Sequence, residues 1–253
     1  MTAIVVRPIR FTDSIAEMRH FLEVLGMRAR IESESGTWVD MVAGAGMVAL
    51  HSAAESTTGA TAGETRLSFE ADDVGALASR LRTHDVADIS VHDEAYGVVL
   101  TCTDPLGDPI TVDGRSTDLY GYRMHQPRPN GRWRVMPVRF TSPLGPYGEF
   151  LQALGLVRRG KPNDYYVIHA GPDTTGQVGL HYVYAHDLPL VPGPAAVHLT
   201  FETDEALEPV ADRLTGHGYS DATITTESFG SMLTVTDPDG RQCQVHTPPA
   251  ADD

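Results

Sequence analysis

Several kinds of residue are scarce in this chain of 253 residues. Its two cysteines, Cys102 and Cys243, lie in apolar stretches without a partner motif, so we expect buried free thiols rather than a disulfide. Lys and Arg total 19 against 34 Asp and Glu, and the net charge of −15 repels phosphate backbones, which argues against nucleic acid as a partner. No apolar run is long enough for a membrane span or a signal-peptide core, so we expect no membrane partner and a cytoplasmic protein.

The chain contains an internal repeat. The tripeptide Arg-Phe-Thr at residues 10–12 returns at residues 139–141, and the stretch at 100–107, which holds a Thr-Asp-Pro-x-Gly turn, returns at 233–240. Two copies that match in order along the chain must fold alike, so the sequence predicts two related domains. Shorter matches between the copies are Leu50-His51 with Leu180-His181 and Phe69-Glu70 with Phe201-Glu202.

Each copy predicts two units of the order strand, helix, three strands. In the first unit a strand covers residues 5–11, and we expect Asp13 to cap a helix that Gly26 ends. In the fourth unit Asp204 is the expected cap, and Pro209 predicts that the helix begins late or bends. The further predicted strands lie near residues 37–42, 47–52, 65–70, 88–92, 97–103 and 109–112.

The domain limits follow from composition. We predict an N-terminal domain at residues 1–115, a linker at 116–132, a C-terminal domain at 133–247 and a disordered tail at 248–253. The linker has no hydrophobic period and ends in Pro-Arg-Pro-Asn-Gly, and the tail carries two prolines and a terminal Asp pair.

A helix that ends in Leu-Gly, three strands, and a late Thr-Asp-Pro-x-Gly turn before the last strand resemble the glyoxalase / bleomycin-resistance / extradiol dioxygenase superfamily, also called vicinal oxygen chelate proteins. The resemblance spans all but the linker and tail. It implies an α+β fold of four βαβββ modules in two glyoxalase-like domains, each with a cupped mixed sheet and helices on the outside. It leaves the function open, because the superfamily includes metal-dependent isomerases, lyases, thiol transferases and ring-cleaving dioxygenases, and also metal-free proteins that sequester drugs.

Alternation along the strands predicts which side chains line each cup. We expect Val135, Pro137 and Arg139 to face the second cup, and Val6, Pro8 and Arg10 to face the first, with Met136, Val138 and Phe140 toward the helices. Two arginines then share a face with a carboxylate, which predicts the internal ion pairs Arg10–Glu70 and Arg139–Glu202. The candidate ligand-binding residues are Arg66, Glu70, Thr111, Arg139, His181, His198, Thr200, Glu202, Gln244 and His246.

The resemblance also implies where a metal would be held: on the first strand of a unit pair, on the strand that opens the next unit, and on the final strand. His198 is the one residue at these positions that matches a usual ligand, because valine has no donor atom and arginine stays charged. We therefore expect no cofactor. The six positions are Val6, Arg66 and Thr111 in the first copy, and Val135, His198 and Gln244 in the second.

A variant metal site in the C-terminal domain is the alternative. Imidazole suits zinc or iron, and several histidines fall on the predicted inner face of the second cup. The metal would then be a divalent ion such as Zn, Fe, Mn or Ni. The weak candidate ligands are His181, His198, Gln244 and His246.

Three functions remain open. The leading hypothesis is a metal-independent protein, a monomer or homodimer, that binds a small molecule and sequesters an antibiotic or secondary metabolite. The second is an enzyme, either a metal-dependent lyase, isomerase or dioxygenase, or a metal-free catalyst; the candidate catalytic residues are Glu202 as base, Arg139 as oxyanion partner and His198. The third is a scaffold whose cups are filled by side chains. Aromatic residues that could provide flat walls for a ligand are Trp38, Trp133, Tyr165, Tyr166, Tyr182 and Tyr184.

Overall fold

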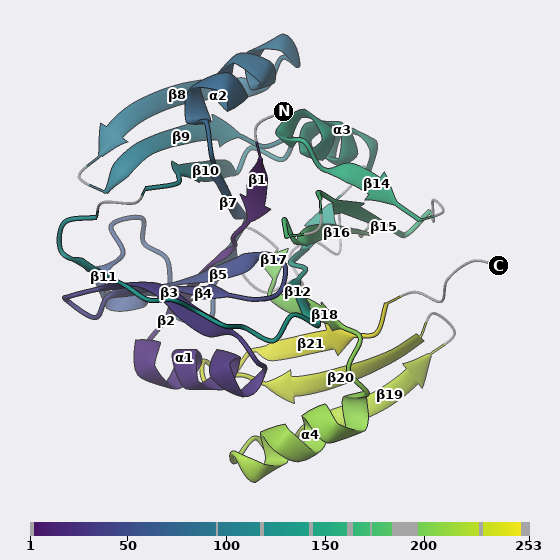
Figure 1. Ribbon diagram of the computed structural model, residues 1–253. Coiled ribbons are helices and arrows are strands. Elements are labelled where there is room, and N and C mark those ends of the chain that lie inside the picture. Colours follow the sequence, from purple (N-terminus) through teal and green to yellow (C-terminus); the bar gives the residue numbers. More distant parts are fainter. Residues whose placement is uncertain are drawn as a thin grey trace.

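The computed structural model describes residues 3–94, 96–116, 119–141, 144–160, 164–172, 174–183, 197–227 and 230–248. In these ranges the chain forms four sheets and four α-helices (Figure 1), which is the α+β fold of four modules that the repeat predicts. None of the helices in these ranges has the length and hydropathy that a membrane crossing needs. The helices are α1 (Ile15–Val24), α2 (Val74–Thr83), α3 (Leu144–Leu154) and α4 (Leu207–Gly216).

The N-terminal domain contains two of the sheets. Sheet A has the strand order β1-β7-β10-β9-β8, and sheet B the order β11-β3-β4-β5-β2-β6. The strands of sheet A are β1 (Ile4–Val6), β7 (Ser68–Ala71), β8 (Ala87–Glu94), β9 (Gly97–Thr103) and β10 (Pro109–Gly114). Those of sheet B are β2 (Ile9–Thr12), β3 (Arg28–Ser33), β4 (Trp38–Val42), β5 (Met47–Ser52), β6 (Thr65–Arg66) and β11 (Tyr122–Met124), and the 3-10 helix η1 (Ala53–Glu55) follows β5.

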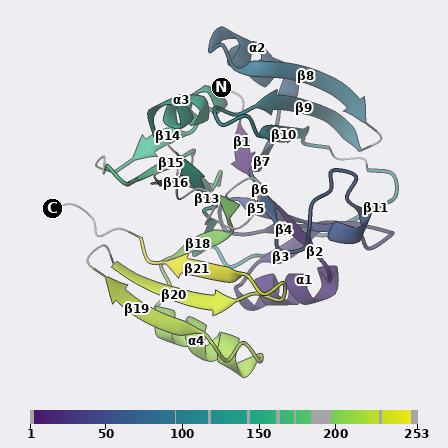
Figure 2. The same cartoon turned by 180° about the vertical axis from the view of Figure 1, so that it is seen from behind.

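The C-terminal domain repeats this plan, as the view from behind also shows (Figure 2). Sheet C has the order β12-β18-β21-β20-β19, and sheet D the order β14-β15-β16-β13-β17. The strands of sheet C are β12 (Trp133–Val135), β18 (Thr200–Thr203), β19 (Thr223–Glu227), β20 (Gly230–Thr236) and β21 (Gln242–His246). Those of sheet D are β13 (Val138–Thr141), β14 (Val157–Arg159), β15 (Tyr166–Ala170), β16 (Gln177–Tyr182) and β17 (Val197–His198).

The ends of the helices follow the local chemistry of the sequence. Ser14, not Asp13 as predicted, caps α1, because its side chain accepts a hydrogen bond from the N–H of Glu17. The helix α4 begins late, at Leu207, which places Pro209 in the first turn, where its missing N–H costs nothing.

The predicted linker is partly structured. The strand β11 lies in it and pairs antiparallel with β3 at the edge of sheet B, so this part of the connection belongs to the N-terminal sheet. The domain limits themselves stay a prediction. Residues 249–253 of the predicted tail lie outside the described part of the chain.

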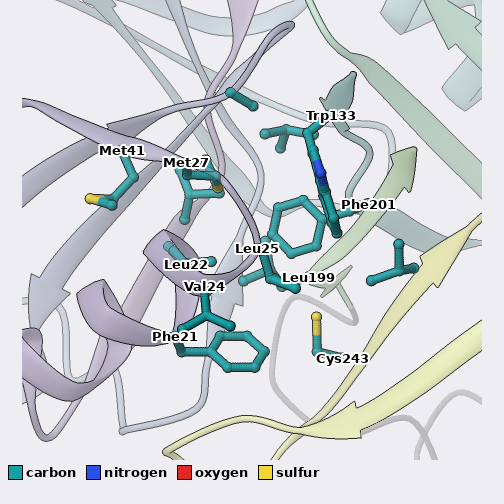
Figure 3. Packing of buried hydrophobic residues seen from close by; sticks show 14 of the residues in the cluster. Phe21, Leu22, Val24, Leu25, Met27, Met41, Trp133, Leu199, Phe201 and Cys243 are labelled. Atoms are coloured by element: carbon teal, nitrogen blue, oxygen red, sulfur yellow. The ribbon is translucent and has the colours of Figure 1, made fainter. Parts of the chain in front are cut away.

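The two domains share their hydrophobic cores. One core combines sheet A and α2 with α3 and sheet D, and the other combines sheet B and α1 with α4 and sheet C. Figure 3 shows the second core, where Phe21 and Leu25 of the first domain pack together with Phe201 and Cys243 of the second. Both cysteines are buried free thiols in these cores, as predicted. Neither domain therefore encloses its apolar residues alone.

On the other face of each pair of sheets lies a cup. We call the facing surfaces of sheets A and B the N-terminal cup, and those of sheets C and D the C-terminal cup. Ion pairs that cross from one sheet to the other identify these faces, such as Arg30 with Glu70 in the first and Arg159 with Glu202 in the second. Two cups thus alternate with two cores around the molecule.

The face prediction for the first strand of each copy was wrong. Val6 and Val135 lie in the cores, whereas Arg7 pairs with a residue inside the N-terminal cup and Met136 contacts side chains of the C-terminal cup. The prediction had placed the side of the strand that carries the arginine, Arg10 or Arg139, in the cup. A shift of one residue exchanges the two faces, so Arg10 and Arg139 lie on the core side.

The predicted pairs Arg10–Glu70 and Arg139–Glu202 are corrected accordingly. Arg10, which is 2% exposed, pairs with Asp237 and with Asp239, the latter at 3.1 Å from its Nε. Each of these arginines meets the Thr-Asp-Pro turn of the other domain. We call the two contacts the clasps.

The second clasp joins the equivalent arginine to the equivalent turn, and one of its two carboxylates, Asp104, corresponds in the repeat to Asp237. Arg139, also 2% exposed, lies with its Nη2 3.2 Å from Asp104 Oδ2 and also pairs with Asp108. A buried guanidinium needs carboxylates around it, and here the carboxylates come from the other domain. The clasps therefore fix how the two domains sit against each other.

Replacing Arg10 with methionine tests the clasp. We expect Arg10→Met to lower the free energy of unfolding by about 3–5 kcal/mol in urea denaturation, because Asp237 and Asp239 stay buried without their cation. Arg19→Met is the matched control: its pair with Glu23 within α1 is partly exposed, and we expect a loss of at most about 1 kcal/mol. Equal losses for the two variants would contradict the clasp.

Candidate functional site

A network of ion pairs crosses the N-terminal cup. Arg7 Nη1 lies 3.3 Å from Asp40 Oδ2, and Arg7 also pairs with Asp113 on β10. Arg30 Nη2 lies 2.9 Å from the same oxygen of Asp40 and pairs with Glu70 on β7. The network thus joins sheet A to sheet B through the middle of the cup.

Two arginines hold the carboxylate of Glu70. It is 3% exposed, and it also accepts a hydrogen bond from Arg115 Nε at 3.1 Å. Burial alone would raise the pKa of Glu70, but the hydrogen bonds and charges of Arg30, Arg7 and Arg115 together lower it below the ordinary value. Glu70 is therefore a structural anion that braces the cup.

This network decides what the N-terminal cup can bind. Each of its three carboxylates, Asp40, Glu70 and Asp113, already contacts an arginine. Arginine has no lone pair to offer a cation and stays protonated. A metal in this cup would have to displace the network.

The C-terminal cup has lost most of these charges. Position by position in the repeat, Met136 replaces Arg7, Ile168 replaces Asp40, and His246 replaces Asp113. The register supports the last assignment, because Glu70 lies beside Asp113 in sheet A as Glu202 lies beside His246 in sheet C. Of the three positions that hold a carboxylate in the N-terminal cup, only the position of Glu70 still holds one here, as Glu202.

Glu202 lies at the centre of this cup and is 1% exposed. Arg159 Nη1 donates to its two oxygens at 3.0 and 3.2 Å, and Arg134 Nη1 lies 3.6 Å away. The same Arg159 nitrogen donates to Gln177 Oε1 at 2.8 Å. The carboxylate is thus held in place by arginines from β12 and β14.

Neutral polar groups surround this carboxylate. The amide of Gln177 and the hydroxyl of Tyr166 donate to the sulfur of Met136, at 3.4 and 3.6 Å. Burial and the negative charge of Glu202 raise the pKa of Tyr166, so its phenol keeps its proton at neutral pH. Tyr166 is therefore a hydrogen-bond donor beside a buried carboxylate.

The three candidate histidines of the second copy differ in their neighbours. His246 is the register neighbour of Glu202, and burial lowers the pKa of His246 although the charge of Glu202 partly opposes this. His198 and His181 instead pack on the ring of Phe140, with centroid distances of 4.7 and 5.3 Å. Burial and the charges of Arg10 and Arg241 lower the pKa of His198.

The other candidate residues also fall in separate places. Gln244 lies beside Thr200 in sheet C, and Thr200 donates its hydroxyl proton to the carbonyl of Met136. Thr111 lies beside Ser68 in sheet A, and Arg66 pairs with Glu64 at the edge of sheet B. Arg139 is in its clasp, so the structure does not bring it to Glu202.

Several residues around Glu202 were not among the candidates. Arg134 and Arg159 hold its carboxylate, and Gln177 holds Arg159 in turn. Aligning the two copies position by position could have pointed to this region, because the change from Arg7 to Met136 shows where the two cups differ. Tyr166 was expected only as an aromatic wall. Tyr184 lies outside the described residues.

Comparisons with known proteins identify the fold. No family model matches the chain, and no curated protein matches it. Among solved structures, the 2,3-dioxygenase LapB from Pseudomonas sp. KL28 is similar at 12% identity, covering 98% of this chain and 92% of that one, with a TM-score of 0.64. The chain has the vicinal oxygen chelate fold. A catechol 2,3-dioxygenase (TM-score 0.62, 12% identity, 98% and 89% covered) and a variant of 4-hydroxymandelate synthase from Streptomyces coelicolor (0.62, 13%, 98% and 93%) are also similar.

The expectation of no cofactor is corrected by these comparisons. The dioxygenases that share this fold are metal-dependent, so the comparisons point to a divalent metal rather than to none. At these identities the likeness itself extends to the fold and not to the reaction.

The donor atoms of the C-terminal cup fit a metal only in part. Glu202 and His246 are adjacent on one face and are both usual ligands. Across the described ranges, however, no three His, Cys, Asp or Glu side chains are grouped so that they could hold an ion. The residues fit a site with two protein ligands and not a three-ligand set.

Glu70→Gln tests the ion-pair network through its pH dependence. Because folding lowers the pKa of Glu70, its stabilising contribution is present above the unfolded value of about 4.5 and is lost as the pH falls through the lower folded value. We expect the variant to be less stable by about 2–3 kcal/mol at pH 7 and the difference from the wild type to shrink toward pH 3 in urea titrations.

The control for this titration is Asp72→Asn, whose carboxylate pairs with Arg115 at the surface. It should change stability by less than about 1 kcal/mol. A difference between the wild type and Glu70→Gln that stays constant from pH 7 to pH 3 would contradict the proposed role of Glu70.

Proposed function

We propose that this protein is a metal-dependent enzyme that transforms a small molecule in its C-terminal cup, as a lyase, isomerase or dioxygenase. The observation that carries the proposal is that Glu202 keeps its carboxylate beside His246, while Met136 and Ile168 replace other charged positions of the network. Ion pairs cross the N-terminal cup and use all of its carboxylates named above, whereas the C-terminal cup holds a carboxylate, positioned by arginines, next to an imidazole, and this combination suits chemistry.

Glu202 and His246 are the residues that would hold the metal. With two protein ligands, further positions on the ion remain for solvent and for the oxygen atoms of a substrate. Imidazole with carboxylate suits zinc, iron, nickel or manganese. When bound, such an ion polarises a substrate oxygen and stabilises negative charge on it.

The remaining side chains would position the substrate. Arg159 holds the Glu202 carboxylate from one side, so that its orientation does not depend on the metal. The phenol of Tyr166, which stays protonated, can donate a hydrogen bond to a substrate oxygen. Met136, between β12 and β13, and Phe140, on β13, provide apolar surface for the body of the molecule.

The comparisons favour this enzyme over drug sequestration. The similar structures named above are two dioxygenases and a synthase, and each of them is similar over nearly all of this chain. A shared fold does not specify a reaction, so the proposal covers the lyase, isomerase and dioxygenase classes. We keep both monomer and homodimer as possible assemblies.

Metal binding is the direct test. We expect purified wild-type protein, free of affinity-tag metal, to take up about one equivalent of Fe(II), Mn(II) or Zn(II) in equilibrium dialysis. Glu202→Gln and His246→Ala should each weaken binding by at least about tenfold, since each removes one of two protein ligands. The metal content is measured by inductively coupled plasma mass spectrometry.

Matched controls lie on exposed parts of the same chain outside the C-terminal cup. Glu208→Gln on α4 and His92→Ala on β8 remove the same groups and should leave binding unchanged. Absence of any bound ion in the wild type, or equal binding by Glu202→Gln and the controls, would overturn the proposal.

A further inference from the structure

The two clasps are not equivalent. In the first, each nitrogen of the Arg10 guanidinium has an acceptor: Nε donates to Asp239 at 3.1 Å, Nη1 donates to Gly63 O and Thr65 Oγ1 at 2.7 and 3.0 Å, and Nη2 pairs with Asp237. This copy shows what a completely satisfied clasp looks like.

The second clasp lacks two of these acceptors. Leu106 stands in the turn where the first clasp has Asp239, and Val197 is the register partner of Arg139 where Thr65 is the partner of Arg10. The side chains of leucine and valine have no atom that can accept a hydrogen bond. Among the described residues, the buried Nε of Arg139 consequently has no hydrogen-bond partner.

The aspartates of this clasp do not supply the missing acceptor, because Asp108 accepts from Arg139 Nη2 and Asp104 is fully used. Asp104 Oδ1 accepts from the N–H groups of Leu106 and Asp108, at 2.8 and 2.9 Å, and its Oδ2 accepts from Tyr147 and Arg139 at 2.7 and 3.2 Å. These four bonds use the capacity of a carboxylate. A buried N–H without an acceptor is unfavourable, and a bound group that accepted from it would restore the missing hydrogen bond.

A cavity of about 300 Å³ lies at this clasp. It is outside both cups, between the turn that follows β9 and the first elements of the C-terminal domain. Its volume is at the lower end of the range for small-molecule sites. Its walls combine apolar surface with two arginines and the two aspartates of the clasp, and include Arg66, Leu67, Asp104, Asp108, Ile110, Arg139, Tyr147 and Val197.

We propose that this cavity binds a small carboxylate with an apolar body. The carboxylate would accept from Arg139 Nε and so take the place that the Asp239 side chain occupies in the first clasp. Arg66 lies on the same wall, where it pairs with Glu64 and donates to Thr58, while Leu67 and Ile110 receive the apolar part. In the first clasp the acceptor is thus the protein's own Asp239 carboxylate, and in the second clasp it is the carboxylate of the ligand.

This site goes beyond the proposed function and does not depend on it. It shares no residue with the group around Glu202, so either proposal can fail while the other holds.

The test rebuilds the first clasp in the second copy. The double variant L106D/V197T supplies both missing acceptors, and V197T alone, a change of similar size, covers the case in which the double variant does not fold. Binding of benzoate is measured by isothermal titration calorimetry, with benzamide as the neutral ligand of the same shape and Glu202→Gln as a control variant in the cup.

We expect saturable one-to-one binding of benzoate to the wild type and to Glu202→Gln, and binding of benzamide weaker by about tenfold or more. L106D/V197T should lose benzoate affinity by at least about tenfold and show a higher Tm without ligand, because its own carboxylate now satisfies Arg139. V197T alone should move both quantities in the same direction by less.

Three outcomes would overturn the proposal. The wild type shows no saturable binding of benzoate at millimolar concentration, or the wild type and L106D/V197T bind it equally, or Glu202→Gln abolishes the binding. The last result would place benzoate in the C-terminal cup instead.

Discussion

The pairing of buried arginines with carboxylates is the interaction on which this structure depends. Arg10 and Arg139 lie on the core side of their strands, where a charge is costly unless it is matched, and the match comes from the turns of the opposite domain. Since the hydrophobic cores are also shared between domains, the clasps and the cores stabilise the same arrangement. The two domains cannot move apart without exposing the clasps and the shared cores to water.

The same pairing distinguishes the cups. In the N-terminal cup, Arg7 and Arg30 bind three carboxylates and join the two sheets. In the C-terminal cup, Met136 and His246 replace one arginine and one aspartate of that network, and Glu202 is left with an imidazole beside it. A gene duplication followed by such a division would free one cup for chemistry while the other supports the fold.

Much of the fold could be predicted from the repeat. The order of strands and helices, the late start of α4 and the burial of both cysteines follow from local patterns, because hydrophobic spacing and capping act within a few residues. The faces of the first strands could not be predicted in this way. A polar residue was assigned to the cup, yet Arg10 is buried on the core side, since its partners lie more than two hundred residues further along the chain.

Local patterns identified only part of the candidate site. Glu202 and His246 were among the candidate residues, and the structure places them side by side. His198, the residue that best matched a usual ligand, packs instead on Phe140, and its burial and the charges of Arg10 and Arg241 lower its pKa. Which histidine meets the carboxylate depends on how β17 and β18 divide between two sheets, and alternation along a strand does not carry that information.

The most direct measurement of this account is anomalous diffraction from crystals of the protein soaked in Mn(II) or Zn(II), with data collected at the metal absorption edge. The account predicts one strong peak within bonding distance of Glu202 and His246, and none among Arg7, Arg30 and Glu70. A peak inside the N-terminal cup, or an empty C-terminal cup in crystals that hold the metal elsewhere, would contradict it.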